Sequence, residues 1–351
     1  MSLNFRIGYS AWGFLGNGVV DTPDGGRSHR MTLLNSLIGR GMKIVMLQKN
    51  RDLDEAGIDL STSSLSFDSF GFPDIDILFL EYRWPIPGRN TGISTEDRFY
   101  TPDLDRQNEL IKHYNLLGKP IFIWDKDQQL SQSEINQMNL NKFLIFEPSL
   151  SPKNNRTSLL FPMDPNRTAQ TYDDLVGYDK NNKSIDLVYI GNQYGRDQSF
   201  SIYYNEASRL LGSPAEIYGK WTKTDQFPNV NFNGRVGFEQ VHSIYTQSFA
   251  NVIIAPERYY KTGQYTQRLF ESLWGLCIPL VPKEYAKHED VFPEELVVNS
   301  ARDVYERLEY LRQLDNDSIV SLFNLLLKRL VVFSDDRQAD TIIRSIWTLY
   351  A

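Results

Sequence analysis

The sequence predicts an α/β protein made of two doubly wound, Rossmann-like domains, and three observations support this prediction. A length of 351 residues fits two domains of ordinary size better than one. Short apolar segments typical of buried strands alternate with segments whose apolar residues recur at helical spacing. Residues 147–184 interrupt this alternation with Pro, Asn, Asp and Ser, after which it resumes, and this indicates a domain boundary.

The first domain is expected to span residues 1–165. Residues 28–39 have apolar side chains at the spacing of a buried helix face. A second helix should begin at Thr101 and Pro102, a capping hydroxyl followed by proline, and should end at Gly118. The strands of a parallel sheet are expected at 5–10, 43–47, 74–82, 119–125 and 142–148.

The second domain is expected to span residues 185–330, after a linker at 166–184. Residues 331–351 should form a C-terminal helix that packs back on the first domain. Strands of the second domain are expected at 185–191, 215–219, 251–256 and 277–282. Doubly wound sheets bind ligands beyond the carboxyl ends of their strands, so the two domains are expected to face each other across a shared cleft.

The composition excludes several classes of protein and site. The chain has 37 basic and 44 acidic residues, and a net charge of −7 is unfavourable for binding nucleic acid unless a groove is locally basic. The single cysteine, Cys277, excludes an internal disulfide framework and a Cys-based zinc site. No apolar run approaches the ~20 residues that span a bilayer, and no secretory signal opens the chain, so we expect a cytoplasmic monomer outside the membrane.

Residues that suit a phosphate group follow the strands of the second domain. Gly191 and Asn192 end its first strand and Arg196 follows at a helix start, where N–H groups and a guanidinium can bind an anion. Tight strand-to-helix turns need glycine in any case, so this motif alone is weak evidence. The following strand ends have Tyr218-Gly219, Gly234-Arg235-Val236 and Glu257-Arg258-Tyr259-Tyr260. Four successive strand ends of this kind favour a nucleotide diphosphate as ligand.

Arg268 and Glu271 lie in the segment YTQRLFESLWGLCIPLVP, which follows directly on the last of these strand ends. The two residues are one helical turn apart and project from nearly the same face. Taken alone, such a pair is typical of a surface salt bridge on a packing helix. Its position after a strand end also fits a pair that clamps a nucleotide.

Two residues of the first domain are candidates for proton transfer. Asp125 stands at a strand end in FIWDKDQQLSQ, and a carboxylate that faces a cleft can act as a general base. Asp125 could equally cap a helix or a turn, and Asp127 could be the working group instead. His29 begins a helix directed towards the same cleft, where it could contact a donor sugar or serve as an alternative base.

The segment EYRWPIPGRNTG, residues 81–92, combines arginine with tryptophan after a strand end. Its candidates for binding an acceptor are Arg83, Trp84, Arg89 and Asn90. Interleaved Arg and Trp can hold phosphates and stack on a base. An aromatic anchor beneath a proline-rich loop would leave the same pattern, and the sequence fits both interpretations.

The second half of the chain resembles the donor domain of glycosyltransferases of the GT-B fold. Within that class the chain is similar to the phage DNA β-glucosyltransferases, which transfer glucose from UDP-glucose to 5-hydroxymethylcytosine in duplex DNA. The similarity covers most of the length, in short islands. It implies a UDP-sugar donor, modified duplex DNA as partner and the host cytoplasm as location. It implies no required cofactor, and the sequence does not indicate a site for Mg²⁺.

The resemblance also implies roles for individual residues. The implied donor-binding set is Gly191, Asn192, Arg196, Tyr218, Gly219, Val236, Tyr260, Arg268 and Glu271. In this set Arg268 would contact the diphosphate, Glu271 the ribose hydroxyls and the turn at Val236 the uracil edge. Asp125 occupies a context similar to that of the family's catalytic Asp. The family has a further Arg in its first loop, whereas the shorter NQYGRD has only Arg196, so the phosphate contacts are expected to differ.

These observations predict an inverting nucleotide-sugar transferase, with a hydroxymethylated base in DNA as the acceptor that the resemblance implies. Transfer to a polysaccharide, a lipid or a small molecule is the alternative among enzymes. A nucleotide-binding module without catalysis is the alternative outside enzymes. A dehydrogenase is disfavoured because no Gly-x-Gly-x-x-Gly motif follows the first strand of either domain.

Overall fold

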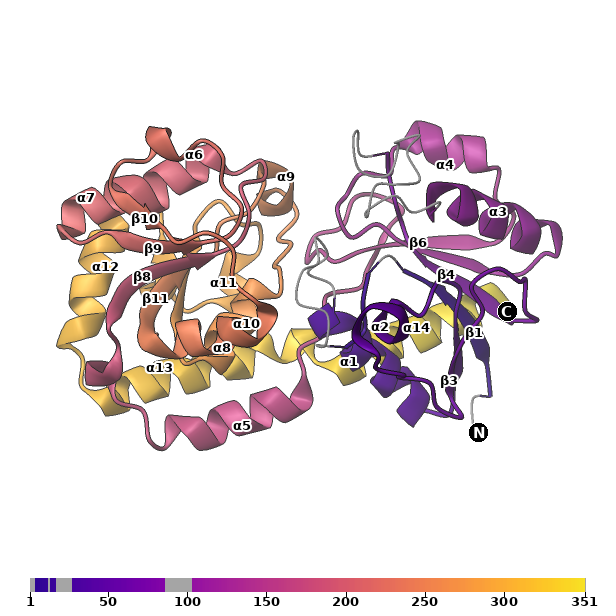
Figure 1. Ribbon diagram of the computed structural model, residues 1–351, viewed down its shortest axis with the longest axis horizontal. Coiled ribbons are helices and arrows are strands. Elements are labelled where there is room, and N and C mark those ends of the chain that lie inside the picture. The colour runs from indigo at the N-terminus through magenta and orange to yellow at the C-terminus, as the bar shows by residue number, and fades with distance from the viewer. Residues whose placement is uncertain (1–3, 12, 17–26, 86–102, 351) are drawn as a thin grey trace. The chain divides into compact units, whose positions relative to one another are not determined.

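The computed structural model describes residues 4–11, 13–16, 27–85 and 103–350 (Figure 1). The chain divides into two compact units. Unit 1 contains residues 1–148, 152–162 and 335–351, and unit 2 contains residues 149–151 and 163–334. The last helix of the chain therefore belongs to the same unit as its first strand.

Unit 1 is built on a seven-stranded sheet of order β3-β2-β1-β4-β5-β6-β7, in which the paired strands are parallel. The strands are β1 (Arg6–Ser10), β2 (Lys43–Met46), β3 (Leu65–Phe67), β4 (Ile77–Glu81), β5 (Ile121–Trp124), β6 (Phe143–Glu147) and β7 (Thr157–Ser158). All five residues of β4 are buried, as expected for a central strand that is covered on both faces. The strand order reverses between β1 and β4.

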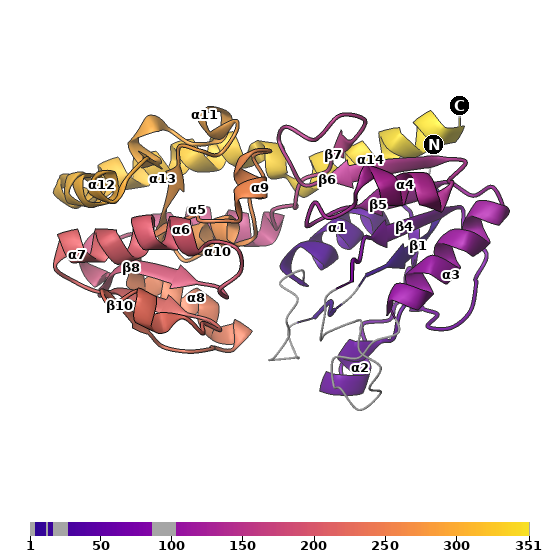
Figure 2. The ribbon, with the colours of Figure 1, turned by 90° about the horizontal axis from the view of Figure 1, so that it is seen from above.

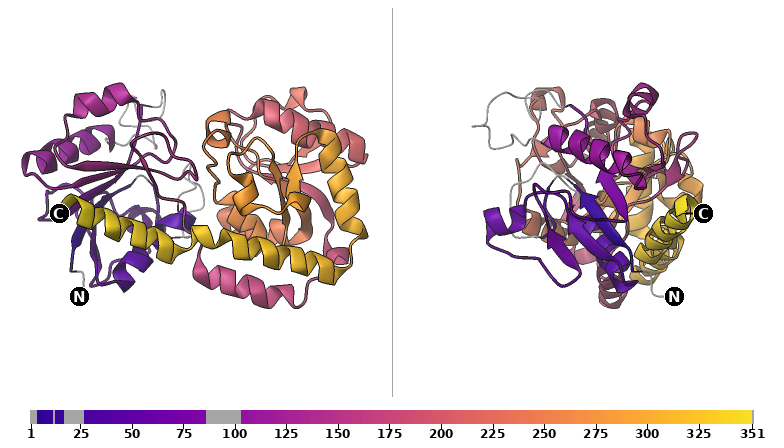
Figure 3. Two further views of the ribbon diagram at one scale, coloured as in Figure 1. Left: turned by 180° about the vertical axis from the view of Figure 1, so that it is seen from behind. Right: turned by 90° about the vertical axis from the view of Figure 1, so that its right-hand side faces the viewer.

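Helices cover the sheet of unit 1. They are α1 (Arg27–Gly39), α2 (Arg51–Ala56), α3 (Asp103–Leu116), α4 (Gln132–Met138) and α14 (Asp335–Tyr350). The local sequence explains where α4 begins, because Ser131 and Glu134 form a reciprocal capping box. Helix α14, the yellow end of the chain in Figure 3, lies against α1, and Arg40 pairs with Asp336 of α14 at 2.8 Å.

Unit 2 is built on a six-stranded sheet of order β10-β9-β8-β11-β12-β13, again with parallel pairs. The strands are β8 (Ile185–Ile190), β9 (Ala215–Tyr218), β10 (Val230–Phe232), β11 (Ser248–Val252), β12 (Ile278–Pro282) and β13 (Val297–Val298). The order reverses between β8 and β11, and ligands of doubly wound sheets bind beside this reversal.

The helices of unit 2 lie on both sides of β8 (Figure 2). They are α5 (Pro165–Leu175), α6 (Asp197–Phe200), α7 (Ala207–Leu211), α8 (Phe238–Gln247), α9 (Glu257–Tyr260), α10 (Arg268–Trp274), α11 (His288–Val291), α12 (Ala301–Gln313) and α13 (Asn316–Arg329). A π-helical turn, Ser201–Glu206, joins α6 to α7. Its Tyr204 hydroxyl donates to the carbonyl of Val252 in β11, so the turn attaches this helix to the sheet.

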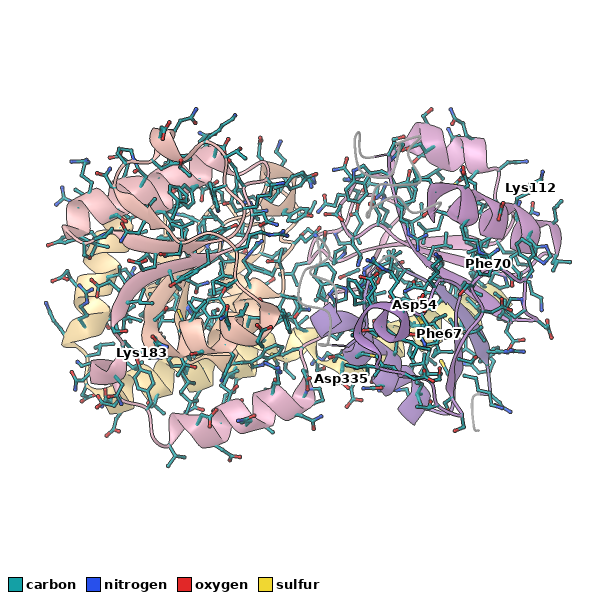
Figure 4. The ribbon with its side chains drawn as sticks, in the orientation of Figure 1. Asp54, Phe67, Phe70, Lys112, Lys183 and Asp335 are labelled. Atoms are coloured by element: carbon teal, nitrogen blue, oxygen red, sulfur yellow. The ribbon has the colours of Figure 1, made fainter. Side chains whose placement is uncertain are left out.

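Two contacts fix the C-terminal end of α10 beside α8. A Cβ added to Gly275, which follows α10, would overlap Tyr245 of α8, so glycine allows the two helices to approach closely. Lys183, labelled in Figure 4, donates to the carbonyl oxygens of Thr246 and Gly275 at 2.8 and 3.3 Å. A cation at the carbonyl end of a helix is stabilising.

The structure confirms the predicted class, a two-domain α/β protein with parallel sheets. The sequence predicts a linker at residues 166–184. In the structure residues 166–175 form part of helix α5, which belongs to unit 2. Asp164 caps this helix and Pro165 occupies its first turn, a start signal that the prediction overlooked. No helix among the described residues is both long and apolar enough to cross a membrane.

Candidate functional site

Two arginines of unit 2 lie at the carboxyl ends of neighbouring strands without a carboxylate partner. Arg196 follows β8 and donates to the carbonyl of Tyr194 and to the hydroxyl of Tyr189. Arg268 begins α10, and its Nε donates to the carbonyl of Ile190 at 2.7 Å. Both guanidinium groups lie within 6 Å of the Tyr189 ring, so they share one aromatic neighbour. Neither forms an ion pair within the described ranges, so both can bind an anionic ligand.

Gly191 is required for this arrangement for a reason the sequence did not reveal. A Cβ on Gly191 would lie 2.6 Å from the terminal nitrogen of Arg268, so any larger residue would displace the guanidinium. The N–H group of Gly191 donates to the carbonyl of Tyr218 at 2.7 Å. The implied role of this N–H as a diphosphate donor is therefore wrong for this conformation, because it already has a partner within the protein.

The loops after β8 and β9 are joined into one platform. The side chain of Asn192 accepts the N–H of Lys220 at 2.7 Å, and Trp221 donates to the carbonyl of Gly191 at 2.9 Å. Gly219 has a φ of +140°, and a Cβ there would overlap the Gly191 carbonyl. The Asn192 side chain and Gly219 thus hold the loop in shape. Arg196 follows this platform in the chain and donates to the carbonyl of Tyr194.

The other predicted donor-site residues differ in how accessible they are. Glu271 is half-buried one turn along α10 from Arg268 and is near enough to affect the pKa of that guanidinium. Val236 is half-buried in the turn after β10. Tyr260 is buried, and its hydroxyl accepts the N–H of Ala255 at 3.1 Å, so it supports the site through packing. The structure brings Arg196, Arg268 and Glu271 together at one edge of the sheet.

In unit 1, Asp125 is not placed as a general base would be. Its side chain is 1% exposed and lies 2.7 Å from Arg156, which also pairs with Glu147 at 2.6 Å. The carboxylate accepts the N–H groups of Gln129 and Leu130 at 2.8 and 2.9 Å. Burial raises the pKa of Asp125 while these donors oppose the increase. The geometry is that of a buried ion pair that orders the turn after β5, which contradicts the expectation that Asp125 faces a cleft.

His29 lies near a second buried charge cluster at the same edge of the unit 1 sheet. Glu81 at the end of β4 accepts hydrogen bonds from Nε and Nη2 of Arg30, at 2.8 and 2.7 Å, and lies 2.6 Å from Lys126. Although burial alone would raise the pKa of Glu81, Arg30 and Lys126 hold it well below its usual value. The His29 ring lies against Trp124 and Phe161.

The imidazole of His29 is buried beside this cluster without a hydrogen-bond partner among the described residues. It is 3% exposed, and both ring nitrogens lack a hydrogen-bond partner in the described part of the chain. Burial lowers the pKa of His29 well below 6.5, and the Lys126 cation lowers it further. His29 is therefore neutral at pH 7, with one nitrogen able to donate and the other able to accept.

The candidate acceptor residues are only partly described. Arg83 is buried, and its guanidinium donates to the Ser10 hydroxyl at 3.1 Å, so it is not exposed for phosphate binding as predicted. Trp84 is half-buried and packs on the core of unit 1, which matches the anchor interpretation. Arg89 and Asn90 lie outside the described residues.

Sequence reasoning missed two residues that shape these sites. They are Arg156, which neutralises Asp125, and Tyr189, which both site arginines contact. Their partners are distant in sequence, so no local motif could identify them. No group of three or more His, Cys, Asp and Glu able to hold a metal occurs in the regions that the structure describes.

Comparison by sequence finds no matching family model and no matching curated protein. Solved structures do match over nearly the whole chain. The T4 phage β-glucosyltransferase, in complex with UDP and Mn²⁺, has a TM-score of 0.62 at 15% identity, with 97% of this chain and 99% of that chain covered. A structure of the DNA-modifying enzyme β-glucosyltransferase has a TM-score of 0.61 at 16% identity, with 97% of this chain and 99% of that chain covered.

Two further solved structures that match this chain come from other proteins. The Anabaena protein HepE, in complex with UDP and glucose, has a TM-score of 0.58 at 8% identity, with 99% of this chain and 100% of that chain covered. A glycosyltransferase of avilamycin A biosynthesis has a TM-score of 0.55 at 11% identity, with 98% of each chain covered. In its fold, this chain therefore resembles the GT-B glycosyltransferases, the T4 phage β-glucosyltransferase among them.

Proposed function

We propose that this chain is an inverting glycosyltransferase that takes its sugar from a UDP-sugar bound by unit 2. The observation that carries the proposal is the pair Arg196 and Arg268. These guanidinium groups lie beside the strand-order reversal of the sheet and have no carboxylate partner within the described ranges. Unneutralised, partly buried cations at this position suit a diphosphate.

The site chemistry follows from what transfer requires. The bond between the anomeric carbon and the UDP oxygen breaks while a bond to an acceptor hydroxyl oxygen forms on the opposite face. Negative charge develops on the departing diphosphate, and Arg196 and Arg268 would stabilise it there. Glu271 is positioned one turn away and would accept hydrogen bonds from the ribose hydroxyls.

Transfer also needs a group that takes the proton of the acceptor hydroxyl. We retain Asp125 as the residue that the resemblance implies, but its carboxylate already accepts bonds from Arg156 and two N–H groups. His29 is the alternative candidate, because a neutral imidazole with an unpaired nitrogen can accept a proton, but burial and the Lys126 cation lower its pKa and so weaken it as a base. We also retain His29 as a candidate contact of the donor sugar.

For the acceptor, we propose a hydroxymethylated base in duplex DNA. The support is the fold shared with a DNA-modifying enzyme. The net charge of −7 and the burial of Arg83 weigh against it. Transfer to a polysaccharide, a lipid or a small molecule is the alternative. It is supported by the similar fold of a glycosyltransferase that takes part in avilamycin A biosynthesis. A nucleotide-binding module without catalysis would bind the donor and transfer nothing.

Calorimetry with UDP tests the donor site. Arg268→Ala and Glu271→Gln should each weaken UDP binding by about 1.5–3 kcal/mol, the usual loss for a hydrogen bond to a charged group. Arg209→Ala, a change of an exposed arginine on α7, is the matched control and should bind UDP as the wild type does. Unchanged UDP affinity in both site variants would show that Arg268 and Glu271 do not bind the nucleotide and belong to a helix that serves packing alone.

A transfer assay tests the acceptor. Nucleotide-sugars would be incubated with hydroxymethylated and unmodified duplex DNA, and the products read by mass spectrometry. A mass gain of one hexose on modified DNA alone supports the DNA acceptor. Donor hydrolysis without transfer to DNA would favour another acceptor, and tight UDP binding with no turnover of any donor would favour a binding module.

A further inference from the structure

Gln267, the residue directly before α10, has a buried side-chain amide that the fold leaves unpaired. The residue is 7% exposed. Its Oε1 and Nε2 atoms are both covered, and neither has a hydrogen-bond partner in the part of the chain that the structure describes. Among the described residues it is the one buried carboxamide for which both atoms are unpaired. Buried polar groups are almost always paired, and leaving one unpaired is unfavourable, so this amide needs an explanation.

Helical geometry places Gln267 beside the proposed donor-site residues. Its carbonyl accepts the N–H of Glu271 at 2.8 Å, and its own backbone angles are helical, at φ −54° and ψ −22°. Since an α-helix has 3.6 residues per turn, Gln267 and Glu271 are about 40° apart around the helix axis. Arg268 lies about 60° from Glu271 in the other direction. Glu271 therefore has Gln267 on one side of it and Arg268 on the other, and the first pair shares one face of the helix.

A second buried glutamine shows what a structural role looks like in this protein. Gln338 of α14 is 3% exposed, and its Oε1 accepts the N–H of Leu160 at 2.8 Å. That amide attaches the last helix of the chain to the segment after β7. Gln267 is buried to a similar degree but makes no such bond with the described residues, so its polar atoms do not stabilise the fold.

A neutral carboxamide with both atoms unpaired suits a ligand that offers a donor and an acceptor side by side. Its oxygen accepts hydrogen bonds and its nitrogen donates them. Two neighbouring hydroxyl groups on a sugar ring meet this requirement, because each hydroxyl can donate as well as accept. An ionised phosphate oxygen can only accept, so a phosphate would leave the amide oxygen unpaired. The chemistry of Gln267 therefore points to sugar hydroxyls rather than to an anion.

We propose that the Gln267 amide binds a pair of neighbouring hydroxyls of the nucleotide-sugar, either on its ribose or on the sugar that is transferred. This inference rests on the proposed function, in which Glu271 binds ribose hydroxyls and Arg268 binds the diphosphate. The amide is covered in this structure, so it must turn towards Glu271, whose side chain is half-buried, to meet the ligand. No hydrogen bond of the amide to the described chain has to break for that rotation.

The test replaces the amide by a thioether of similar length. UDP and UDP-glucose are titrated by calorimetry into wild type, Gln267→Met, Arg268→Ala and Gln338→Met, and the thermal unfolding of each protein is measured without ligand. Gln267→Met should weaken UDP-glucose binding about tenfold, the usual effect of losing two neutral hydrogen bonds. Its unfolding temperature should not fall, because an apolar group replaces polar atoms that had no partner in the described chain.

Gln338→Met is the matched control, because it makes the same change at a glutamine whose amide is paired. It should unfold at a lower temperature than wild type, since the N–H of Leu160 loses its acceptor, and it should bind both ligands as wild type does. The two ligands distinguish the two sources of the hydroxyls. Weaker binding of both UDP and UDP-glucose by Gln267→Met assigns the amide to the ribose, and weaker binding of UDP-glucose alone assigns it to the transferred sugar.

The remaining outcomes separate this inference from the proposed function. If Arg268→Ala weakens binding while Gln267→Met binds both ligands as wild type does, the donor site stands and the role of Gln267 is overturned. A lower unfolding temperature for Gln267→Met would also overturn it, because the amide would then have a structural partner. If wild type binds neither UDP nor UDP-glucose, the proposed function and the inference both fail.

Discussion

At the scale of single residues, the two units use buried charges in opposite ways. Asp125 of unit 1 is fully paired with Arg156 and backbone N–H groups. In the described structure the hydrogen bonds of Arg196 and Arg268 in unit 2 go to carbonyl and hydroxyl oxygens, and neither arginine pairs with a carboxylate. A paired buried charge stabilises a turn, whereas a cation without a counter-ion is available to a ligand.

Asp125→Asn should lower the free energy of unfolding rather than selectively abolish transfer. The substitution leaves Glu147 as the one carboxylate that pairs with Arg156 among the described residues, and it removes the charge that accepts two N–H groups, which we expect to cost about 3–5 kcal/mol. Urea unfolding measures this loss, with Asp54→Asn, an exposed change on α2, as control. A stable Asp125→Asn protein that binds UDP but transfers no sugar would instead establish Asp125 as the base.

His29 should make stability depend on pH. Its pKa is lowered in the folded protein, so the unfolded chain binds a proton first as the pH falls below about 6.5. Stability is then lost towards acid, by up to about 1.4 kcal/mol per pH unit. His29→Phe keeps an aromatic ring against Trp124 and Phe161 but cannot titrate, so its unfolding free energy should fall less between pH 6.5 and 5. Parallel curves for the two proteins would contradict the lowered pKa.

At the scale of elements, the position of α10 decides the geometry of the proposed donor site. Arg268 begins this helix and Gly275 follows its end. At that end, contacts with α8 and Lys183 fix the helix, while at its beginning Gly191 leaves space for the guanidinium of Arg268. Two glycines distant in sequence therefore allow one short helix to present its side chains.

Gly275→Ala should separate α10 from α8. The added methyl would overlap Tyr245 and press on its backbone, so we expect a loss of about 1–3 kcal/mol in the free energy of unfolding and weaker UDP binding. Gly39→Ala at the end of α1 is the control, because a Cβ there meets no atom within 4 Å. Equal stabilities for the two variants in urea unfolding would show that the helices can move apart without cost.

At the scale of the whole molecule, the acidic charge limits how DNA could bind. If DNA is the acceptor, the sequence predicts a phosphate-binding rim on the first domain made by Arg83, Arg89, Arg98 and Arg106, which lie in one stretch of the chain. In the structure Arg83 is buried and Arg106 donates to the carbonyl of Gly71. Arg89 and Arg98 lie outside the described residues. The described part of unit 1 therefore provides fewer phosphate contacts than the four predicted.

The salt dependence of duplex binding tests whether Arg89 and Arg98 contact DNA phosphates. Each phosphate contact adds about −0.9 to the slope of log affinity against log salt. Arg89→Ala and Arg98→Ala should each flatten the slope by about one unit if DNA is the acceptor. Arg83→Ala should leave the slope unchanged and lower stability instead, because Arg83 is buried. Duplex binding that is undetectable at low salt would exclude the DNA acceptor.

The sequence by itself determined the architecture of this protein. Strands and helices alternate because apolar residues recur at periods that local backbone geometry imposes, so the order of elements could be read without tertiary contacts. The same patterns predicted Arg196, Arg268 and Glu271 as candidates for a donor site, since ligand sites of doubly wound sheets follow strand ends. The start of α5 was missed although its signals, Asp164 and Pro165, are local.

Only the tertiary structure decided which of the candidate groups are free to act. Asp125 and Arg268 are both polar residues beside a strand end, but Arg156 neutralises one while no carboxylate pairs with the other in the described chain. Burial and pairing depend on contacts between residues far apart in the chain, and a single sequence does not contain those distances.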